Sequence, residues 1–240
     1  MFISTKEFVK GFQEAFGENT SLPLVFSYSD QPVADTPKVM GCFFKALPDA
    51  RRGIPVSLHE GNMTCGGGKF YTGFIDMPPH VPVFVAEKEK YKKSAEMMRE
   101  CLAALGVQRT TKAYLNFVRV DQAETFEGME GLLFFATPDV LSGLATWAYY
   151  DNNDADAVSA PFGSGCCSTI QMAVKENSLG GQRTFIGLFD LSVRPHVGEN
   201  ELGFVIPRTR FQTMQHTLRE CSLFGAKAWP KVRARITGED

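Results

Sequence analysis

Cysteine is the residue type in this 240-residue chain with the most chemical potential, and six are present. Cys166 and Cys167 stand side by side behind the turn Gly163-Ser164-Gly165, and Cys65 stands directly before three glycines. Thiolates bind soft metals and iron–sulfur clusters, and they are also nucleophiles. The two glycine and cysteine segments therefore raise three alternatives, namely a metal centre, a reactive thiol or a ligand-binding loop.

A thiolate-bound metal centre is the first interpretation, with an iron–sulfur cluster as the leading hypothesis. Its candidate ligands are Cys42, Cys65, Cys166 and Cys167, because three or four thiolates suffice for such a centre. No Cys-x-x-Cys pair is present, so the spacing alone does not specify a metal. The expected role is redox chemistry or sensing.

A reactive thiol is the second interpretation, with Cys166 or Cys167 as the nucleophile. Both are expected at the N-terminus of a helix over residues 168–175, where the helix dipole favours the thiolate. His59, which precedes the Cys65 segment, is the candidate base or added ligand. Whether the chain is an enzyme stays open.

Binding of a small-molecule cofactor by the glycine loops is the third interpretation, because exposed backbone N–H groups make such loops good anion sites. The residues assigned to it are Gly66, Gly67, Gly68, Lys69, Gly163 and Gly165. The remaining alternative is a structural or interaction protein without chemistry, in which the glycines only allow tight turns.

Other residues with chemical potential have simpler explanations. Cys101 and Cys221 fall on the apolar stripes of two predicted helices, so they are expected to be structural. Asp76 and Asp190 each end a predicted strand. A turn cap is favoured for these aspartates over a paired acid–base role.

The composition limits the partners and the compartment. With 25 Lys and Arg against 27 Asp and Glu, the net charge is -2, which offers no basic surface for nucleic acid or an anionic membrane. We therefore expect no nucleic-acid and no membrane partner, and a small-molecule ligand is the class that remains. The first residues lack an apolar secretion signal, which predicts a cytoplasmic protein with reduced thiols.

An internal repeat is the predicted organisation. The segment from Phe84-Val85-Ala86 to Arg99-Glu100-Cys101 resembles the segment 120 residues later, from Phe204-Val205-Ile206 to Arg219-Glu220-Cys221. This match predicts an α+β (mixed α/β) fold made by tandem duplication, with two βαβββα halves about a pseudo-twofold axis. The cysteine segments would then face each other in the cleft between the halves.

The predicted boundaries follow from this repeat. An N-terminal helix lies within residues 1–20, and two halves, 21–110 and 111–240, pack as one globular domain. Strands are expected at about 22–28, 54–58, 70–75 and 82–86, and again at 131–136, 156–160, 183–190 and 202–206. Helices are expected at 5–16, 36–47, 88–105, 138–149 and 208–223, and the glycine loops at 61–69 and 162–168.

Two of these segments also resemble a known family. Cys65-Gly66-Gly67-Gly68-Lys69-Phe70-Tyr71-Thr72-Gly73-Phe74 and Ile206-Pro207-Arg208-Thr209-Arg210-Phe211 are similar to the bacterial and archaeal family called domain of unknown function 169. The resemblance extends from about residue 8 to residue 225. It implies a family cysteine at Cys42 and a Cys-x-Gly-Gly element at residues 65–68. It implies no activity, because none is established for the family.

Overall fold

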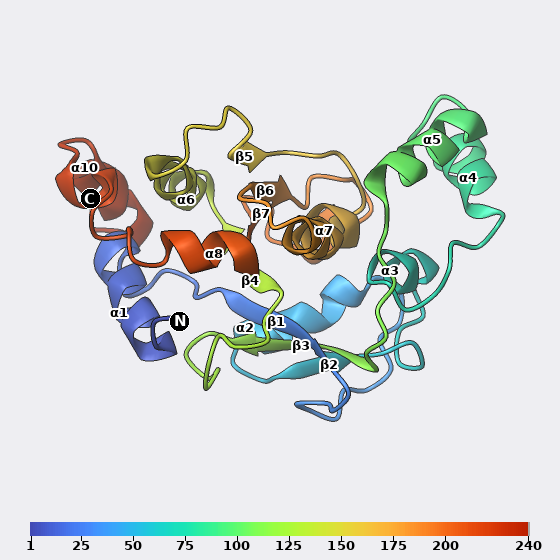
Figure 1. Ribbon diagram of the computed structural model, residues 1–240, viewed down its shortest axis with the longest axis horizontal. Helices are drawn as coiled ribbons and strands as arrows, with labels where there is room; N and C mark the ends of the chain where they lie inside the picture. The colour runs from blue at the N-terminus through green and yellow to red at the C-terminus, as the bar shows by residue number, and fades with distance from the viewer. Residues whose placement is uncertain (240) are drawn as a thin grey trace.

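The computed structural model describes residues 1–239, in which helices cover both faces of a seven-stranded mixed sheet (Figure 1). The predicted α+β class is confirmed. The strands are β1 (Leu24–Ser29), β2 (Val56–Leu58), β3 (Tyr114–Arg119), β4 (Gly131–Ala136), β5 (Val158–Ser159), β6 (Thr184–Gly187) and β7 (Leu202–Pro207).

The helices vary widely in length. The α-helices are α1 (Thr5–Phe16), α2 (Leu47–Arg51), α3 (Gly66–Tyr71), α4 (Val81–Val83), α5 (Ala95–Leu105), α6 (Pro138–Tyr150), α7 (Met172–Ser178), α8 (Arg208–Met214), α9 (Ser222–Gly225) and α10 (Trp229–Thr237). Two 3₁₀ turns, η1 (Phe43–Ala46) and η4 (Arg194–His196), and two π-helical turns, η2 (Phe84–Lys88) and η3 (Cys167–Gln171), complete the set.

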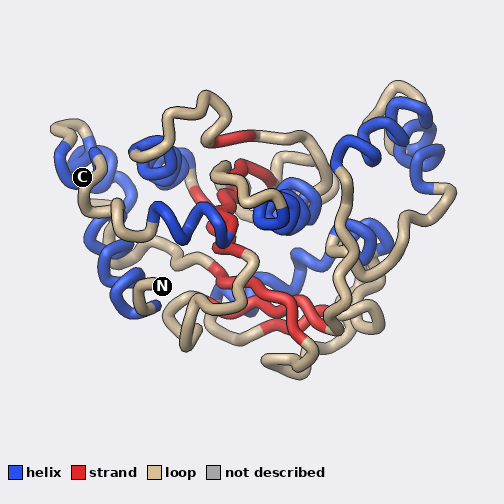
Figure 2. The backbone as a smooth tube through the Cα atoms, in the orientation of Figure 1, coloured by secondary structure: helices blue, strands red, loops and turns tan. Residues whose placement is uncertain are grey.

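The sheet has the order β2-β3-β1-β4-β7-β6-β5, with β1 and β4 paired near its centre (Figure 2). Neighbouring strands are antiparallel except β5 and β6, which are parallel. The register pairs Phe26 with Gly131 and Phe134 with Phe204. This arrangement joins the N-terminal and C-terminal strands into one sheet.

Alternation along the central strands divides the core in two, because successive side chains of a strand point to opposite faces. One set packs under α1, α6, α8 and α10; its strand residues are Val25, Leu132, Phe134, Phe204 and Ile206. The other set packs under α2, α3, α5 and η3; its strand residues are Leu24, Phe26, Leu133, Phe135 and Val205. We call the second side the thiol face, because Cys166 and Cys167 belong to it and Cys42 packs against it.

Several local predictions are confirmed. Helix α1 has the predicted bounds, since Phe8, Phe12 and Phe16 form one buried stripe and the Ser4 hydroxyl caps the backbone N–H of Glu7 at 3.1 Å. Strand β4 also has the predicted bounds and is buried along its whole length. Strands β1, β2, β5, β6 and β7 and helix α6 lie within about two residues of their predicted positions or inside them.

The strands predicted at 70–75 and 82–86 are wrong. Residues 66–71 form α3, and residues 81–88 form α4 and the π-helical turn η2. Pro82 occupies the first turn of α4, where its missing N–H costs nothing, and Val83 and Phe84 stay 40% and 47% exposed without a sheet neighbour. The apolar composition of this segment favours a strand over the observed helix.

The internal duplication is not confirmed. Phe84 starts a π-helical turn, whereas Phe204, its expected counterpart, lies in β7. Strand β3 was not predicted, and it lies beyond residue 110 yet pairs with β1 and β2 of the first predicted half. The predicted helix 36–47 is reduced to η1 and the start of α2, and the predicted helix 208–223 ends as α8 at Met214.

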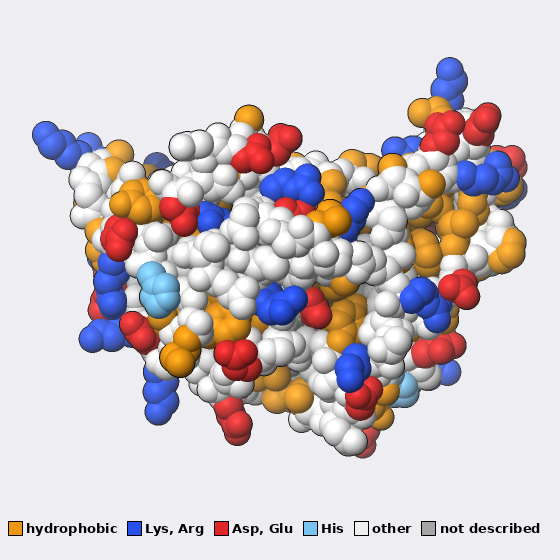
Figure 3. All heavy atoms as spheres, viewed as in Figure 1, with side chains coloured by type: hydrophobic (Ala, Val, Ile, Leu, Met, Phe, Trp, Pro, Cys, Tyr) orange, Lys and Arg blue, Asp and Glu red, His pale blue; other side chains and the backbone are white. Residues whose placement is uncertain are grey.

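The surface around α4 and α5 carries several exposed hydrophobic side chains (Figure 3). Within residues 1–239, no helix has the length and apolar character needed to cross a membrane.

Candidate functional site

The Cys65 segment is the start of a helix and not the loop expected over residues 61–69. Cys65 is the N-cap of α3, and its Sγ accepts a hydrogen bond from the backbone N–H of Gly68 at 3.2 Å. A Cβ on Gly68 would lie 3.2 Å from Cδ1 of Phe43, so this glycine allows close packing. The first two glycines stay exposed, which leaves this end of α3 accessible.

The Cys166 segment meets the Cys65 segment directly. Cys166 is 7% exposed, and its Sγ lies 3.4 Å from the hydroxyl of Ser164 and 3.9 Å from the backbone oxygen of Gly67. Gly165 allows close packing against Val193, because a Cβ there would lie 2.8 Å from its Cγ2. The two predicted glycine and cysteine segments therefore contact each other on the thiol face.

The pKa values of Cys166 and Cys42 are affected by burial and by neighbouring thiols. Burial raises the pKa of Cys166 well above its usual range, and the neighbouring thiols of Cys65, Cys167 and Cys42 raise it further. Burial likewise raises the pKa of Cys42 to about 11, with Cys65 and Asp190 adding to the shift. The thiol of Cys65 therefore affects the pKa of both Cys42 and Cys166.

Cys167 has different surroundings from its neighbour in sequence. Burial raises its pKa to about 12; Cys101 and Asp190 add to the shift and Lys175 opposes it. Consecutive residues of a helix point about 100° apart, which separates the vicinal pair. Cys101 is half-buried on α5, so the expectation that it only packs in the core is incomplete.

The helix N-terminus does not produce the thiolates expected at Cys166 and Cys167. The pKa of each thiol is raised, because loss of hydration outweighs the dipole of the helix that follows. A low-pKa nucleophile at either position is therefore unsupported.

Tyr71 of α3 packs in the same core cluster as Cys166 and Cys167. Burial raises the pKa of its phenol, and Cys167 and Cys166 are the next largest causes. Tyr28 of β1 donates its hydroxyl hydrogen to the backbone oxygen of Thr72 at 2.7 Å, which ties α3 to the sheet. Neither tyrosine was found from the sequence, because no local pattern places them beside the cysteines.

The four candidate ligands do not form one compact group. In the part of the chain that the structure describes, no three His, Cys, Asp or Glu side chains are placed to hold a single metal ion. Any metal centre at Cys42, Cys65 and Cys166 must therefore span a wider space than one ion does or require the thiols to move.

The other predicted site residues lie in separate environments. His59 accepts a hydrogen bond at Nδ1 from the backbone of Gly61 at 3.1 Å, and its ring packs edge-on against Tyr114 at 5.4 Å. The first contact lies within a tight turn, and the second is with the first residue of β3. Lys69 is half-buried on α3. Gly163 packs closely against Cys167, because a Cβ on it would lie 3.2 Å from the Cys167 Sγ.

The two predicted aspartates differ sharply. Asp76 has a 92% exposed side chain that pairs with Arg109 at 3.2 Å. Asp190 is 3% exposed, and its Oδ1 accepts hydrogen bonds from the backbone N–H and hydroxyl of Ser192. The predicted turn cap is confirmed for Asp190. Its burial beside the thiols was not predicted.

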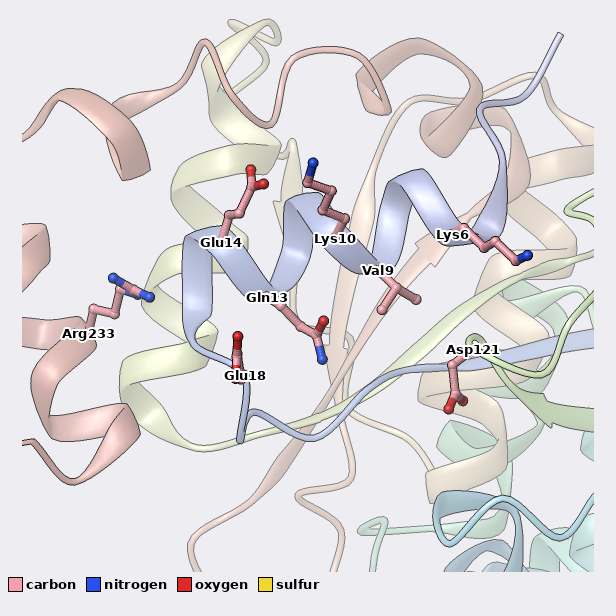
Figure 4. A pocket seen from close by; sticks show the side chains of 8 residues that line it. All are labelled: Lys6, Val9, Lys10, Gln13, Glu14, Glu18, Asp121 and Arg233. Atoms are coloured by element: carbon pink, nitrogen blue, oxygen red, sulfur yellow. The ribbon is translucent and has the colours of Figure 1, made fainter.

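A mixed-charge groove of about 470 Å³ lies along α1 (Figure 4). It is lined by Lys6, Val9, Lys10, Gln13, Glu14, Glu18, Asp121 and Arg233. Its charges are of both signs and no cysteine lines it, so it is separate from the two cysteine segments.

Alkylation of the apo protein tests the burial of the thiols. At neutral pH, Cys167 should carry on the order of a thousandfold less thiolate than an ordinary cysteine, because its pKa is raised to about 12. We expect iodoacetamide to modify half-buried Cys65 well before Cys166 and Cys167, with labelling of Cys167 increasing as the pH rises. Peptide mass spectrometry over time measures the order in which the cysteines are alkylated. Unfolding in urea should abolish the difference between them. Equal native rates would contradict the described burial.

These observations define an α+β protein in which two cysteine segments contact each other on one face of the sheet. The model of the DUF169 family, described as "Uncharacterised ArCR", matches residues 20–216, and the chain belongs to this family. No curated protein and no solved structure matches the chain.

Proposed function

We propose that this protein binds an iron–sulfur cluster through Cys42, Cys65 and Cys166 and uses it in redox chemistry or sensing. The observation that carries the proposal is the contact between the two cysteine segments, with Cys166 Sγ 3.9 Å from the Gly67 oxygen. Cys65 and Cys42 also add to the raised pKa of Cys166, and thiolates are the ligands that iron–sulfur clusters use.

We propose a cluster in place of a single metal ion. A structural zinc ion needs four ligands arranged tightly about one point, and the described residues contain no such group. The cysteines of a cluster bind different iron atoms, so they are spread farther apart. Cys65 adds to the raised pKa of both Cys42 and Cys166, which supports assigning the three thiols to one centre.

The burial of Cys166 fits a metal ligand as well. A neutral buried thiol is inert as a nucleophile, but a bound metal ion deprotonates it and supplies the compensating positive charge. Exposed Gly66 and Gly67 leave a way for iron and sulfide to reach the site. Cys167 is omitted from the ligand set, because its environment is shared with Cys101 and Lys175.

Small-molecule binding or thiol catalysis at the same segments is the alternative. Half-buried Cys65 is the cysteine best placed for catalysis, but the contacts of His59 are with Gly61 and Tyr114. The raised pKa values of Cys42, Cys166 and Cys167 oppose thiolate catalysis by these residues.

Anaerobic reconstitution tests the proposal. The full-length apo protein is incubated with ferrous iron, sulfide and a thiol reductant, desalted, and assayed for iron, sulfide and visible absorption. We expect bound iron and sulfide in equal amounts, with sulfur-to-iron charge-transfer absorption that disappears on exposure to oxygen. A folded protein that retains neither iron nor sulfide would refute the cluster.

A further inference from the structure

The groove along α1 lies between elements that are held firmly together. Helix α10 forms one wall, and the indole N–H of its first residue, Trp229, donates to the backbone oxygen of Ala15 at 2.9 Å. The ring of Trp229 also packs edge-on against that of Phe16 at 5.5 Å. Gly17 brings the two helices close, since a Cβ there would overlap Cγ2 of Thr237. A groove with fixed walls binds a ligand without the cost of ordering those walls.

Two of the three carboxylates that line the groove are paired with arginines. Oε2 of Glu14 accepts hydrogen bonds from Nε of Arg219 at 2.9 Å and from its Nη2 at 2.6 Å. Asp121 accepts from Arg119 through both of its oxygens, at 2.7 Å and 2.8 Å. Neither arginine lines the groove. These two carboxylates therefore bring little net negative charge to it.

The three cations of the lining have no such partners. Within residues 1–239, Lys6, Lys10 and Arg233 form no ion pair, and Nε of Arg233 is buried without a hydrogen-bond partner. Glu18 is the one lining carboxylate that no basic side chain of the described residues pairs with. The groove thus has an excess of two positive charges, which attracts an anion.

The unpaired cations lie toward opposite ends of the groove. Arg233 projects from α10 toward the C-terminal end of α1, whereas Lys6 is in the first turn of α1 and Lys10 is one turn later (Figure 4). Along the axis of α1, Lys6 and Gln13 are about 10 Å apart. Val9 lies between them, and the methylene stems of the lysines add to its apolar surface. The lining therefore suits a ligand with an anionic group at each end and a less polar middle.

From these observations we infer that the groove along α1 binds a small organic dicarboxylate. The planar guanidinium of Arg233 donates two parallel hydrogen bonds to one carboxylate, and Lys6 and Lys10 hold the other. Two carboxylates balance the excess of two positive charges, whereas two phosphate groups would exceed it. The volume of about 470 Å³ is within the range of small-molecule sites. This site does not depend on the proposed cluster, because no cysteine lines it.

Isothermal titration calorimetry of the full-length protein at low ionic strength tests the inference with three probes. Octanedioate has a carboxylate at each end of an apolar chain. Succinate has two carboxylates on a chain too short to reach both ends of the groove, and octanoate has only one carboxylate. We expect octanedioate to bind roughly tenfold more tightly than either of the others, because it alone meets both groups of cations. A folded wild type that does not bind octanedioate, or binds all three probes equally, would overturn the inference.

Two pairs of variants locate the binding. R233Q should weaken octanedioate binding roughly tenfold, since it removes the guanidinium that holds one carboxylate. Its matched control is R235Q, because Arg235 is on the same helix but outside the lining and pairs with Asp139 at 2.6 Å. E18Q should strengthen binding about threefold by removing the unpaired negative charge. Its control is E7Q, because Glu7 is exposed on α1 and does not line the groove.

The controls should bind octanedioate as the wild type does, and circular dichroism confirms that each variant is folded. Equal affinities of R233Q and R235Q would overturn the assignment of the site to this groove. If R233Q fails to fold, E18Q and E7Q decide, because loss of structure does not strengthen binding. Equal affinities of E18Q and E7Q would then overturn it.

Discussion

Replacing Cys166 with alanine should reduce the iron retained after anaerobic reconstitution to about a tenth of the wild-type amount or less. The variant loses the thiol that connects the two cysteine segments, at 3.9 Å from the Gly67 oxygen. C42A and C65A should show the same loss, because each removes one of the three proposed thiolate ligands. Iron analysis after desalting measures the effect.

The matched control is C167A. Cys167 is adjacent in sequence and also buried, at 1% exposed, so its replacement makes a similar change in packing. We expect C167A to retain iron at the wild-type level, because Cys167 shares its environment with Cys101 and Lys175. Equal loss of iron from C166A and C167A, with both proteins folded, would contradict the assignment of Cys166 as the ligand.

Replacing Trp147 with alanine should lower the free energy of unfolding by about 3–5 kcal/mol. Trp147 of α6 is fully buried on the sheet side opposite the thiol face, and its ring lies 6.5 Å from that of Phe8. Its indole N–H donates to the Met214 oxygen at 3.2 Å and to the Thr217 hydroxyl at 3.1 Å. The variant leaves a cavity and removes the donor for both acceptors.

Urea denaturation followed by circular dichroism measures this loss, with Y150A as the control. Tyr150 is on the same helix but 46% exposed, so its truncation should change the free energy of unfolding by only about 0.5 kcal/mol. A W147A variant as stable as Y150A would show that α6 does not pack against the sheet as described.

The parts of the fold that were predicted correctly have strong local signals. Helix α1 combines a capping serine with phenylalanines at helical spacing, and β4 is a short apolar run between turns. Strand β3 carried a usable signal that was missed, because buried Leu115 and Phe117 alternate with more polar neighbours. The helical turn at Phe84 had no such signal, since β-branched and aromatic residues there favour a strand until tertiary context decides.

The candidate site was predictable only in part. The ligand set Cys42, Cys65, Cys166 and Cys167 that the sequence suggested stays a prediction. The apparent repeat suggested that the cysteine segments meet, and they do, although the repeat itself is not confirmed. The sequence could not separate Cys166 from Cys167, because their directions depend on how the π-helical turn begins. It also could not distinguish Asp190 from Asp76, since burial arises from packing between distant segments.

The central claim is that Cys42, Cys65 and Cys166 hold an iron–sulfur cluster. Anomalous diffraction at the iron absorption edge, from crystals of the reconstituted protein grown without oxygen, tests it most directly. We predict a strong anomalous peak bounded by these three sulfurs. A well-ordered map with three free thiols and no peak among them would contradict it.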